Sequence, residues 1–143
     1  MKVLSKRAFY ILSLTWGLPM TLIGGVVMLV LIICGKKPKK WGYTYYIEVG
    51  KKWGGLELGM FFITNENPSL ALQYHEFGHG IQNCYFGWLM PFIVCIPSAV
   101  RYWYRIIRQK LGYKNTGYNS IWFERQATEL GRKYVERNIR GEI

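Results

Sequence analysis

The sequence contains no aspartate, and its acidic residues are eight glutamates. Without aspartate the chain cannot form a Ser-His-Asp triad, an aspartic-protease dyad or an EF-hand calcium loop. Histidine is almost as scarce, because His75 and His79 are the only two in the chain. A catalytic or metal site must therefore be built from a short set of side chains.

Negative charge is scarce too, since 19 lysines and arginines outnumber the eight glutamates and leave a net charge of +11. Half of the residues are hydrophobic and 17% are aromatic, which is too many for a disordered chain. A length of 143 residues allows one domain, with or without an appendage. The positive charge keeps open an alternative function as a basic lipid-binding or nucleic-acid-binding protein.

Cysteines are few and odd in number, at positions 34, 84 and 95, each within an apolar stretch. They therefore do not indicate a disulfide framework. Small buried hydrophobic side chains are the simplest interpretation, and this interpretation is compatible with a reducing compartment.

Charge is absent from the 26 residues between Phe9 and Cys34. About 20 apolar residues suffice for a helix to cross a bilayer. A cleaved signal peptide fits less well, because the run is long and no small-residue cleavage site precedes Lys36. The sequence therefore predicts an uncleaved transmembrane helix within residues 1–35, followed by a domain over residues 36–143.

The sequence gives little indication of the orientation of this single N-terminal span in the membrane, because basic residues flank both of its ends. Residues 36–143 carry 16 of the 19 positive charges. Positively charged segments tend to remain on the cytoplasmic side. This bias favours a bacterial cytoplasmic membrane protein whose domain faces the cytoplasm.

The domain over residues 36–143 is expected to be α+β. Residues 43–49 and 56–64 have the aromatic and aliphatic content of strands, and residues 51–55 supply turn chemistry between them. Ser69 is a suitable N-cap for a helix that runs to about residue 84. A last helix is predicted over residues 122–138, with Ser120 as its cap.

An apolar segment lies between these two helices. Residues 85–100 are too few for a full span, so we expect them to be re-entrant, interfacial or buried in the domain. Arg101, Arg105 and Arg108 follow at helical spacing among aromatic residues. This pattern is typical of an interfacial helix, and residues 85–110 are therefore predicted to associate with membrane lipid rather than with nucleic acid.

The chemistry-bearing motif is His75-Glu76-Phe77-Gly78-His79, an H-E-x-x-H sequence. Residues four apart share one face of a helix, so both histidines can bind one Zn²⁺. Glu76 would then stand beside the metal, where it can act on water. The motif predicts a zinc site with Glu76 as the catalytic residue.

A catalytic zinc site usually has three protein ligands, and the third must here be a glutamate or a cysteine. Glu48, Glu57 and Glu66 precede the motif, and Cys84 follows it closely. Glu124 stands out because it lies near a helix start beside three large apolar residues. A carboxylate buried there needs a cationic partner, although a carboxylate favoured by the helix dipole remains an alternative.

The motif and the later segment Glu124-Arg125-Gln126-Ala127 together resemble the HExxH plus ExxA signature of gluzincin-type zinc metallopeptidases. Residues 53–59, 81–83 and 96–99 also resemble a group of small bacterial membrane proteins that carry this motif. The resemblance covers roughly residues 50–131. It implies a zincin-like fold in which residues 56–64 lie beside the cleft and pair with an extended substrate.

The resemblance implies that His75, His79 and Glu124 bind zinc and that Glu76 is the general base. The expected activity is hydrolysis of a peptide or protein substrate by a membrane-anchored zinc metalloendopeptidase, and a non-catalytic zinc-binding membrane protein is the alternative. Tyr113 and Tyr118 are candidate oxyanion donors. Thr128 stands where many gluzincins have an aspartate that supports a motif histidine.

Overall fold

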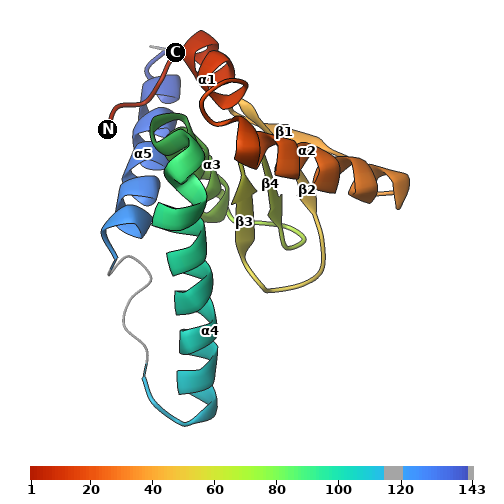
Figure 1. The fold of residues 1–143 in the computed structure, drawn as a ribbon, viewed down its shortest axis with the longest axis vertical. Coiled ribbons are helices and arrows are strands. Elements are labelled where there is room, and N and C mark those ends of the chain that lie inside the picture. The colour runs from red at the N-terminus through yellow and green to blue at the C-terminus, as the bar shows by residue number, and fades with distance from the viewer. Residues whose placement is uncertain (115–120, 142–143) are drawn as a thin grey trace.

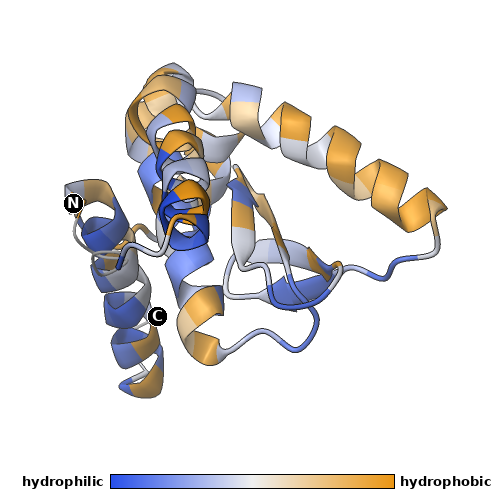
Figure 2. Cartoon of the chain, turned by 90° about the horizontal axis from the view of Figure 1, so that it is seen from below, coloured by the Kyte–Doolittle hydropathy of each residue, from blue (hydrophilic) through white to orange (hydrophobic). Residues whose placement is uncertain are grey.

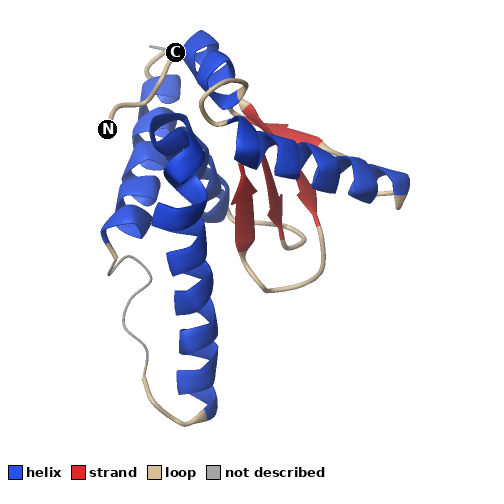
Figure 3. Ribbon diagram, in the orientation of Figure 1, coloured by secondary structure: helices blue, strands red, loops and turns tan. Residues whose placement is uncertain are grey.

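The computed structural model describes residues 1–114 and 121–141 (Figure 1). The chain is α+β, as predicted, and combines helices with one four-stranded sheet (Figure 3). Ser120 and Tyr118 lie outside the described residues.

The prediction of one long N-terminal helix is wrong. Residues 9–34 are divided between α1 (Lys6–Ser13) and α2 (Leu18–Ile33), which are bent by 88° relative to each other. Pro19 has no N–H for a helical bond to the preceding turn, and the Asn83 side chain donates a hydrogen bond to the carbonyl of Gly17 at 3.2 Å. Both features place the break between the two helices.

No single helix within residues 1–114 and 121–141 is long and apolar enough to cross a membrane. Two helix pairs reach the required length and composition only when their bent halves are taken together. The first pair is α1 with α2, and the second spans residues 70–110 with a bend of 114°.

Helix α1 belongs to the aromatic core of the domain. Phe9 is fully buried, and its ring lies 6.0 Å from the ring of Phe77 and 5.6 Å from that of Tyr43. Tyr134 packs on the same group, with ring centroids 4.4 Å from Phe77. Helix α1 therefore packs in the same aromatic cluster as Phe77 and Tyr134.

The sheet comprises β1 (Lys39–Trp41), β2 (Thr44–Glu48), β3 (Gly55–Leu58) and β4 (Phe61–Thr64) in the order β1-β2-β4-β3. Strands β2 and β4 are parallel, and the other two pairs are antiparallel. Strands β1 and β3 are thus the two edges of the sheet. Strand β1 was not predicted, because its lysines were assigned to a basic segment flanking the membrane.

The single strand predicted over residues 56–64 is a hairpin. Gly59 has a φ of +76°, a conformation that glycine adopts without strain, and the chain reverses there between β3 and β4. Leu58 and Phe61 are consequently partners on two antiparallel strands and do not belong to one continuous strand. A second residue at the turn, Met60, completes the reversal.

The two faces of the sheet pack against different helices (Figure 1). Leu58 and Phe61 share one face with Tyr45, and Gly24 of α2 packs against the first two of them. Tyr46 lies on the other face of the sheet, which packs against α3 (Leu70–Phe86). Its hydroxyl accepts a hydrogen bond from Gln73 of that helix at 3.0 Å.

Helix α3 packs closely on α5 (Trp122–Ile139). A Cβ added to Gly78 would clash with the carbonyl oxygen of Ala127, and one added to Gly131 would clash with that of Tyr74. The two glycines therefore let the helix backbones approach each other.

Residues 85–110 turn back from α3. A 3₁₀ turn (Gly87–Leu89) and a π-helical turn (Pro91–Cys95) lead into α4 (Ile96–Lys110). Met90 and Val94 are buried within this turn region. Helix α4 then extends away from the rest of the molecule (Figure 1).

Candidate metal centre

The two motif histidines lie together on α3. Ser69 caps the helix as predicted, because its hydroxyl accepts a hydrogen bond from the Leu72 amide at 3.1 Å. His75 and His79 are both buried, and their Nε2 atoms lie 3.2 Å apart. The helical spacing thus directs both Nε2 atoms to one point.

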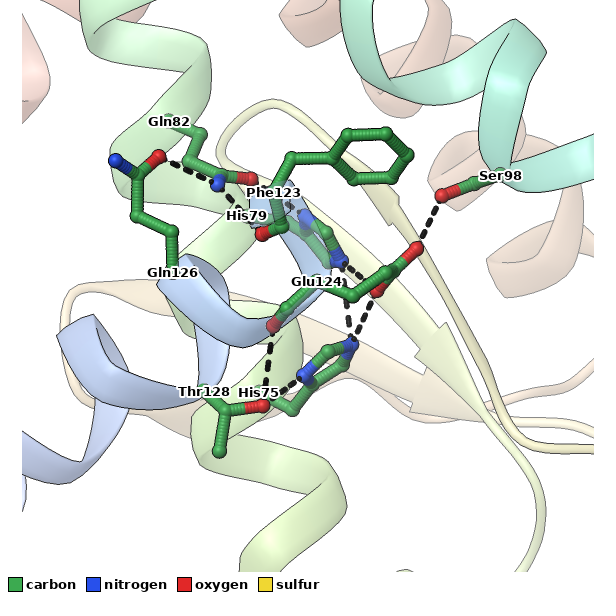
Figure 4. A network of polar contacts seen from close by, with 8 residues as sticks. All are labelled: His75, His79, Gln82, Ser98, Phe123, Glu124, Gln126 and Thr128. Carbon is green, nitrogen blue, oxygen red and sulfur yellow. Dashed lines mark hydrogen bonds and ion pairs between the residues drawn. The ribbon is translucent and has the colours of Figure 1, made fainter. Parts of the chain in front are cut away.

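Helix α5 brings Glu124 to the same point (Figure 4). Glu124 lies in the first turn of α5, and its Oε2 is 3.1 Å from the Nε2 of His75 and 3.1 Å from that of His79. All three side chains are buried, and they form a group able to hold a metal ion. The structure therefore brings together the three ligands expected from the sequence.

Gln82 fixes the orientation of His79. The Gln82 amide nitrogen donates to the Phe123 carbonyl at 2.8 Å and to the Gln126 side-chain oxygen at 2.9 Å. Its oxygen consequently faces the Nδ1 of His79, at 2.7 Å. Because an amide oxygen only accepts, Nδ1 carries the proton and Nε2 is left with a lone pair.

Thr128 plays the same part for His75. Its hydroxyl donates to the main-chain carbonyl of Glu124 at 3.2 Å. The hydroxyl oxygen can therefore accept from the Nδ1–H of His75, which lies 2.8 Å away. Thr128 thus supports this histidine, and in the neutral ring the Nε2 of His75 is also left with a lone pair.

Ser98 holds the carboxylate of Glu124 from α4. Its hydroxyl donates to Oε1 of Glu124, so that Oε2 is turned toward the histidines (Figure 4). Burial opposes ionisation of Glu124, but the hydrogen bonds with His75, His79 and Ser98 hold the pKa of its carboxyl well below the usual range. Glu124 is thus ionised at neutral pH.

The converging atoms fit a divalent cation. When both histidines are neutral, two imidazole lone pairs and a carboxylate oxygen lie 3.1–3.2 Å from one another, and they repel one another unless a proton or a metal ion lies between them. Ligands of a tetrahedral zinc ion, with bonds of 2.0–2.1 Å, lie about 3.3 Å apart. The observed spacing is close to this value, so His75, His79 and Glu124 would hold zinc with little rearrangement.

A proton competes with a metal for this position. Burial lowers the pKa of His79, but its hydrogen bond with Glu124 and the charge of nearby carboxyl groups outweigh this effect and raise its pKa to about 9. Without a metal, His79 is therefore protonated at neutral pH, and metal binding must release that proton.

Glu76 lies beside His75, His79 and Glu124, and all four residues line one cavity. Burial raises the pKa of its carboxyl, although the two histidines oppose the shift. Gly55 of β3 makes room for this side chain, because a Cβ at that position would lie 2.6 Å from Oε1 of Glu76. The edge strand thereby sets the position of Glu76 without contributing a side chain of its own.

The metal centre opens into a cavity of about 640 Å³. Its walls are largely apolar and come from β3, α3 and α4, with Leu56, Leu72 and Tyr102 among them. Within the described residues, no lysine or arginine lines this cavity, although the chain has 19 of them. The positive charge of the protein is thus kept away from the site.

Glu57 is a third buried carboxyl at this cavity. Its Oε1 accepts a hydrogen bond from the amide of Gly59. Burial raises the pKa of its carboxyl to about 8, so Glu57 is largely neutral at pH 7. Glu124, whose pKa is held low, therefore supplies the negative charge beside the histidines.

Other candidates from the sequence lie elsewhere. Cys84 contacts Ser13 at 3.3 Å and is separate from the metal group, and Cys34 is exposed instead of buried. Tyr113 is 63% exposed and packs against Arg108. It does not line the cavity.

The sequence did not predict the supporting roles of Ser98 and Gln82. Both residues lie in segments that resemble the small bacterial membrane proteins, residues 81–83 and 96–99, but that resemblance assigned neither of them a role. Gln82 also lies one helical turn after His79. Ser98 reaches Glu124 through the turn between α3 and α4, which the sequence does not show.

We expect Thr128→Val to weaken zinc binding by about 10- to 100-fold, the usual cost of removing a group that supports a metal ligand. Valine has the shape of threonine but cannot accept the Nδ1–H of His75. Zinc titration against a competing chelator measures the effect.

Thr64→Val is the matched control for this substitution. The hydroxyl of Thr64 is buried and has no hydrogen-bond partner, so its loss should leave zinc affinity unchanged. Equal affinities for both variants and the wild type would contradict the role of Thr128.

Comparison with known protein families, with curated proteins and with solved structures finds no match to this chain.

Proposed function

We propose that the chain is a zinc-dependent metallopeptidase of the gluzincin type. The observation that carries the proposal is the convergence of His75, His79 and Glu124, with Glu76 beside them in an open cavity. A closed structural zinc site has four protein ligands. The group found within the described residues has three, which leaves a position for water and favours catalysis over a purely structural role.

A zinc ion in this site would acidify water and polarise the carbonyl of the scissile peptide bond. Glu76 accepts one proton from the attacking water while the oxygen of that water bonds to the carbonyl carbon. It then donates this proton to the leaving nitrogen when the C–N bond breaks. Burial raises the pKa of the Glu76 carboxyl, which makes the carboxylate a stronger base toward the attacking water.

The cavity favours cleavage within a chain over removal of a C-terminal residue. A C-terminal carboxylate requires a cationic partner in a buried site, and no lysine or arginine of the described residues lines this cavity. Its apolar walls suit uncharged side chains on either side of the scissile bond. We therefore infer endopeptidase activity on apolar polypeptide segments.

The test is hydrolysis of an unstructured protein substrate by the purified chain. Activity should disappear after a chelator has removed zinc and should return when one equivalent of zinc is added, because the three side chains alone do not activate water. Hydrolysis that persists after complete chelation would show that the zinc mechanism is wrong.

A further inference from the structure

One carboxyl group at the cavity has no part in the proposed mechanism. Glu57 of β3 lines the cavity and is only 5% exposed, but it is not one of the three side chains that converge on the metal position. Within residues 1–114 and 121–141, its Oε2 atom is buried without a hydrogen-bond partner. An unpaired buried polar atom is unfavourable, so this atom is a candidate for contact with a bound molecule.

The two oxygens of this carboxyl group differ in what they can do. Oε1 accepts a hydrogen bond from the amide of Gly59, at the turn between β3 and β4. Burial raises the pKa of the Glu57 carboxyl to about 8, so at neutral pH the group largely carries a proton. Because Oε1 already accepts a hydrogen bond, Oε2 is the oxygen suited to carry this proton and to donate.

The side chain of Glu57 lies between the sheet and α3. Successive residues of a strand face opposite sides of the sheet, so Glu57 shares its side with Gly55 and not with Leu58. Gly55 lies against Glu76 of α3, whereas Leu58 packs against α2, which is hydrophobic over most of its length (Figure 2). Glu57 therefore projects toward the helix that carries the two histidines.

The outer edge of β3 borders the same cavity. Strand β3 is at one end of the sheet, and residues 53–57 all line the cavity. An extended polypeptide can add to such an edge as a further strand. Residues directly opposite each other in paired strands project to one face, with Cβ atoms about 4.5–5.5 Å apart. A substrate residue opposite Glu57 would therefore place its side chain beside the Glu57 carboxyl.

The surroundings of Glu57 favour an uncharged hydrogen-bond acceptor. Glu124 is ionised at the same cavity and would repel an acidic substrate side chain. A protonated Glu57 offers no negative charge to a lysine or arginine, and an apolar side chain would leave Oε2 unpaired. The side-chain amide of glutamine or asparagine has an uncharged oxygen that accepts a hydrogen bond.

We propose that Glu57 is a specificity-determining residue, which selects polypeptide segments that place a glutamine or asparagine side chain opposite it on β3. The inference rests on the proposed peptidase function, because it concerns the substrate of the same cavity. It adds one polar position to a segment that the apolar walls otherwise require to be uncharged. Such selection is measurable as binding, without hydrolysis.

The experiment measures peptide binding to the full-length, zinc-loaded Glu76→Gln variant, in which the expected loss of hydrolysis keeps each peptide intact. The probes are fluorescent, alanine-rich peptides in which a single glutamine is moved along the sequence. Two further sets carry leucine or lysine at the same positions. Fluorescence anisotropy gives the affinity of each peptide.

We expect one position at which glutamine binds about 2- to 10-fold more tightly than leucine, the range for one net hydrogen bond. Adding Glu57→Leu should abolish this preference. Adding Glu57→Gln should retain it, because the amide can accept from Gly59 with its oxygen and donate with its nitrogen. Glu66→Leu is the matched control, since Glu66 is exposed and does not line the cavity, and it should leave the preference unchanged.

Equal affinity of glutamine and leucine peptides at every position, tighter binding of the lysine peptides, or binding of no peptide would each overturn the inference. These outcomes are measured with Glu57 in place, so they do not depend on the folding of Glu57→Leu. A preference that persists in a zinc-loaded Glu57→Leu variant would overturn it as well.

The same peptides separate this inference from the proposed activity. If the wild-type chain binds the glutamine peptide preferentially but does not cleave it, selection by Glu57 stands and the peptidase proposal fails. If the wild-type chain cleaves all the peptides alike, the peptidase proposal stands and selection by Glu57 fails.

Discussion

Replacing Glu76 with glutamine should lower the rate of peptide hydrolysis by about 10²- to 10⁴-fold, the usual contribution of a general base. Glutamine has nearly the same shape as glutamate but cannot take a proton from water. The side chain would still fit against Gly55, where the space is closely matched to Glu76. The effect is measured as the initial rate of hydrolysis at saturating zinc.

The control for Glu76→Gln is the zinc content of the same preparation. Glu76 is not one of the three converging ligands, so the variant should retain one zinc ion per chain. Loss of zinc together with activity would show that Glu76 binds the metal. An unchanged rate would remove it from the mechanism.

Gly78→Ala should destabilise the fold and weaken zinc binding. The added methyl group would clash with the carbonyl oxygen of Ala127, so α3 and α5 would have to separate, and the histidines lie on α3 while Glu124 lies on α5. Overpacking of this kind costs about 1–3 kcal/mol or more, which exceeds the gain of about 1 kcal/mol from helix propensity. Chemical denaturation and zinc titration measure the two effects.

Gly80→Ala is a matched control two residues further along α3. The nearest atom to its added Cβ would be the carbonyl oxygen of Gly59, at 3.3 Å. A shift of a few tenths of an ångström accommodates this contact, and the same gain in helix propensity applies. We expect stability and zinc affinity near those of the wild type. If both variants behaved alike, close approach of α3 and α5 would not explain Gly78.

The metal group could be predicted because its signals are local. His75 and His79 converge through helical periodicity alone, and Glu124 was marked by its apolar neighbours and by the later ExxA motif. The supporting bond from Thr128 could not be read from the sequence, because it depends on how α5 lies against α3.

The errors at the N-terminus and in the sheet have a common cause. An uncharged run such as residues 9–34 does not reveal that Phe9 packs in the core while Asn83 binds the turn at Gly17. Likewise, the strand-like composition of residues 56–64 masks a hairpin that the positive φ of Gly59 permits. In both cases tertiary contacts divide a segment whose local pattern looks continuous.

The central claim is that His75, His79 and Glu124 hold one zinc ion. Its most direct test is the measurement of zinc content and affinity for the wild-type chain and for Glu124→Ala, purified and titrated side by side. We predict one zinc ion per wild-type chain. For Glu124→Ala we predict a zinc affinity that is lower by more than about 100-fold. Loss of a metal ligand should cost more than loss of a group that only supports a ligand. Full zinc occupancy of Glu124→Ala with unchanged affinity would contradict this account.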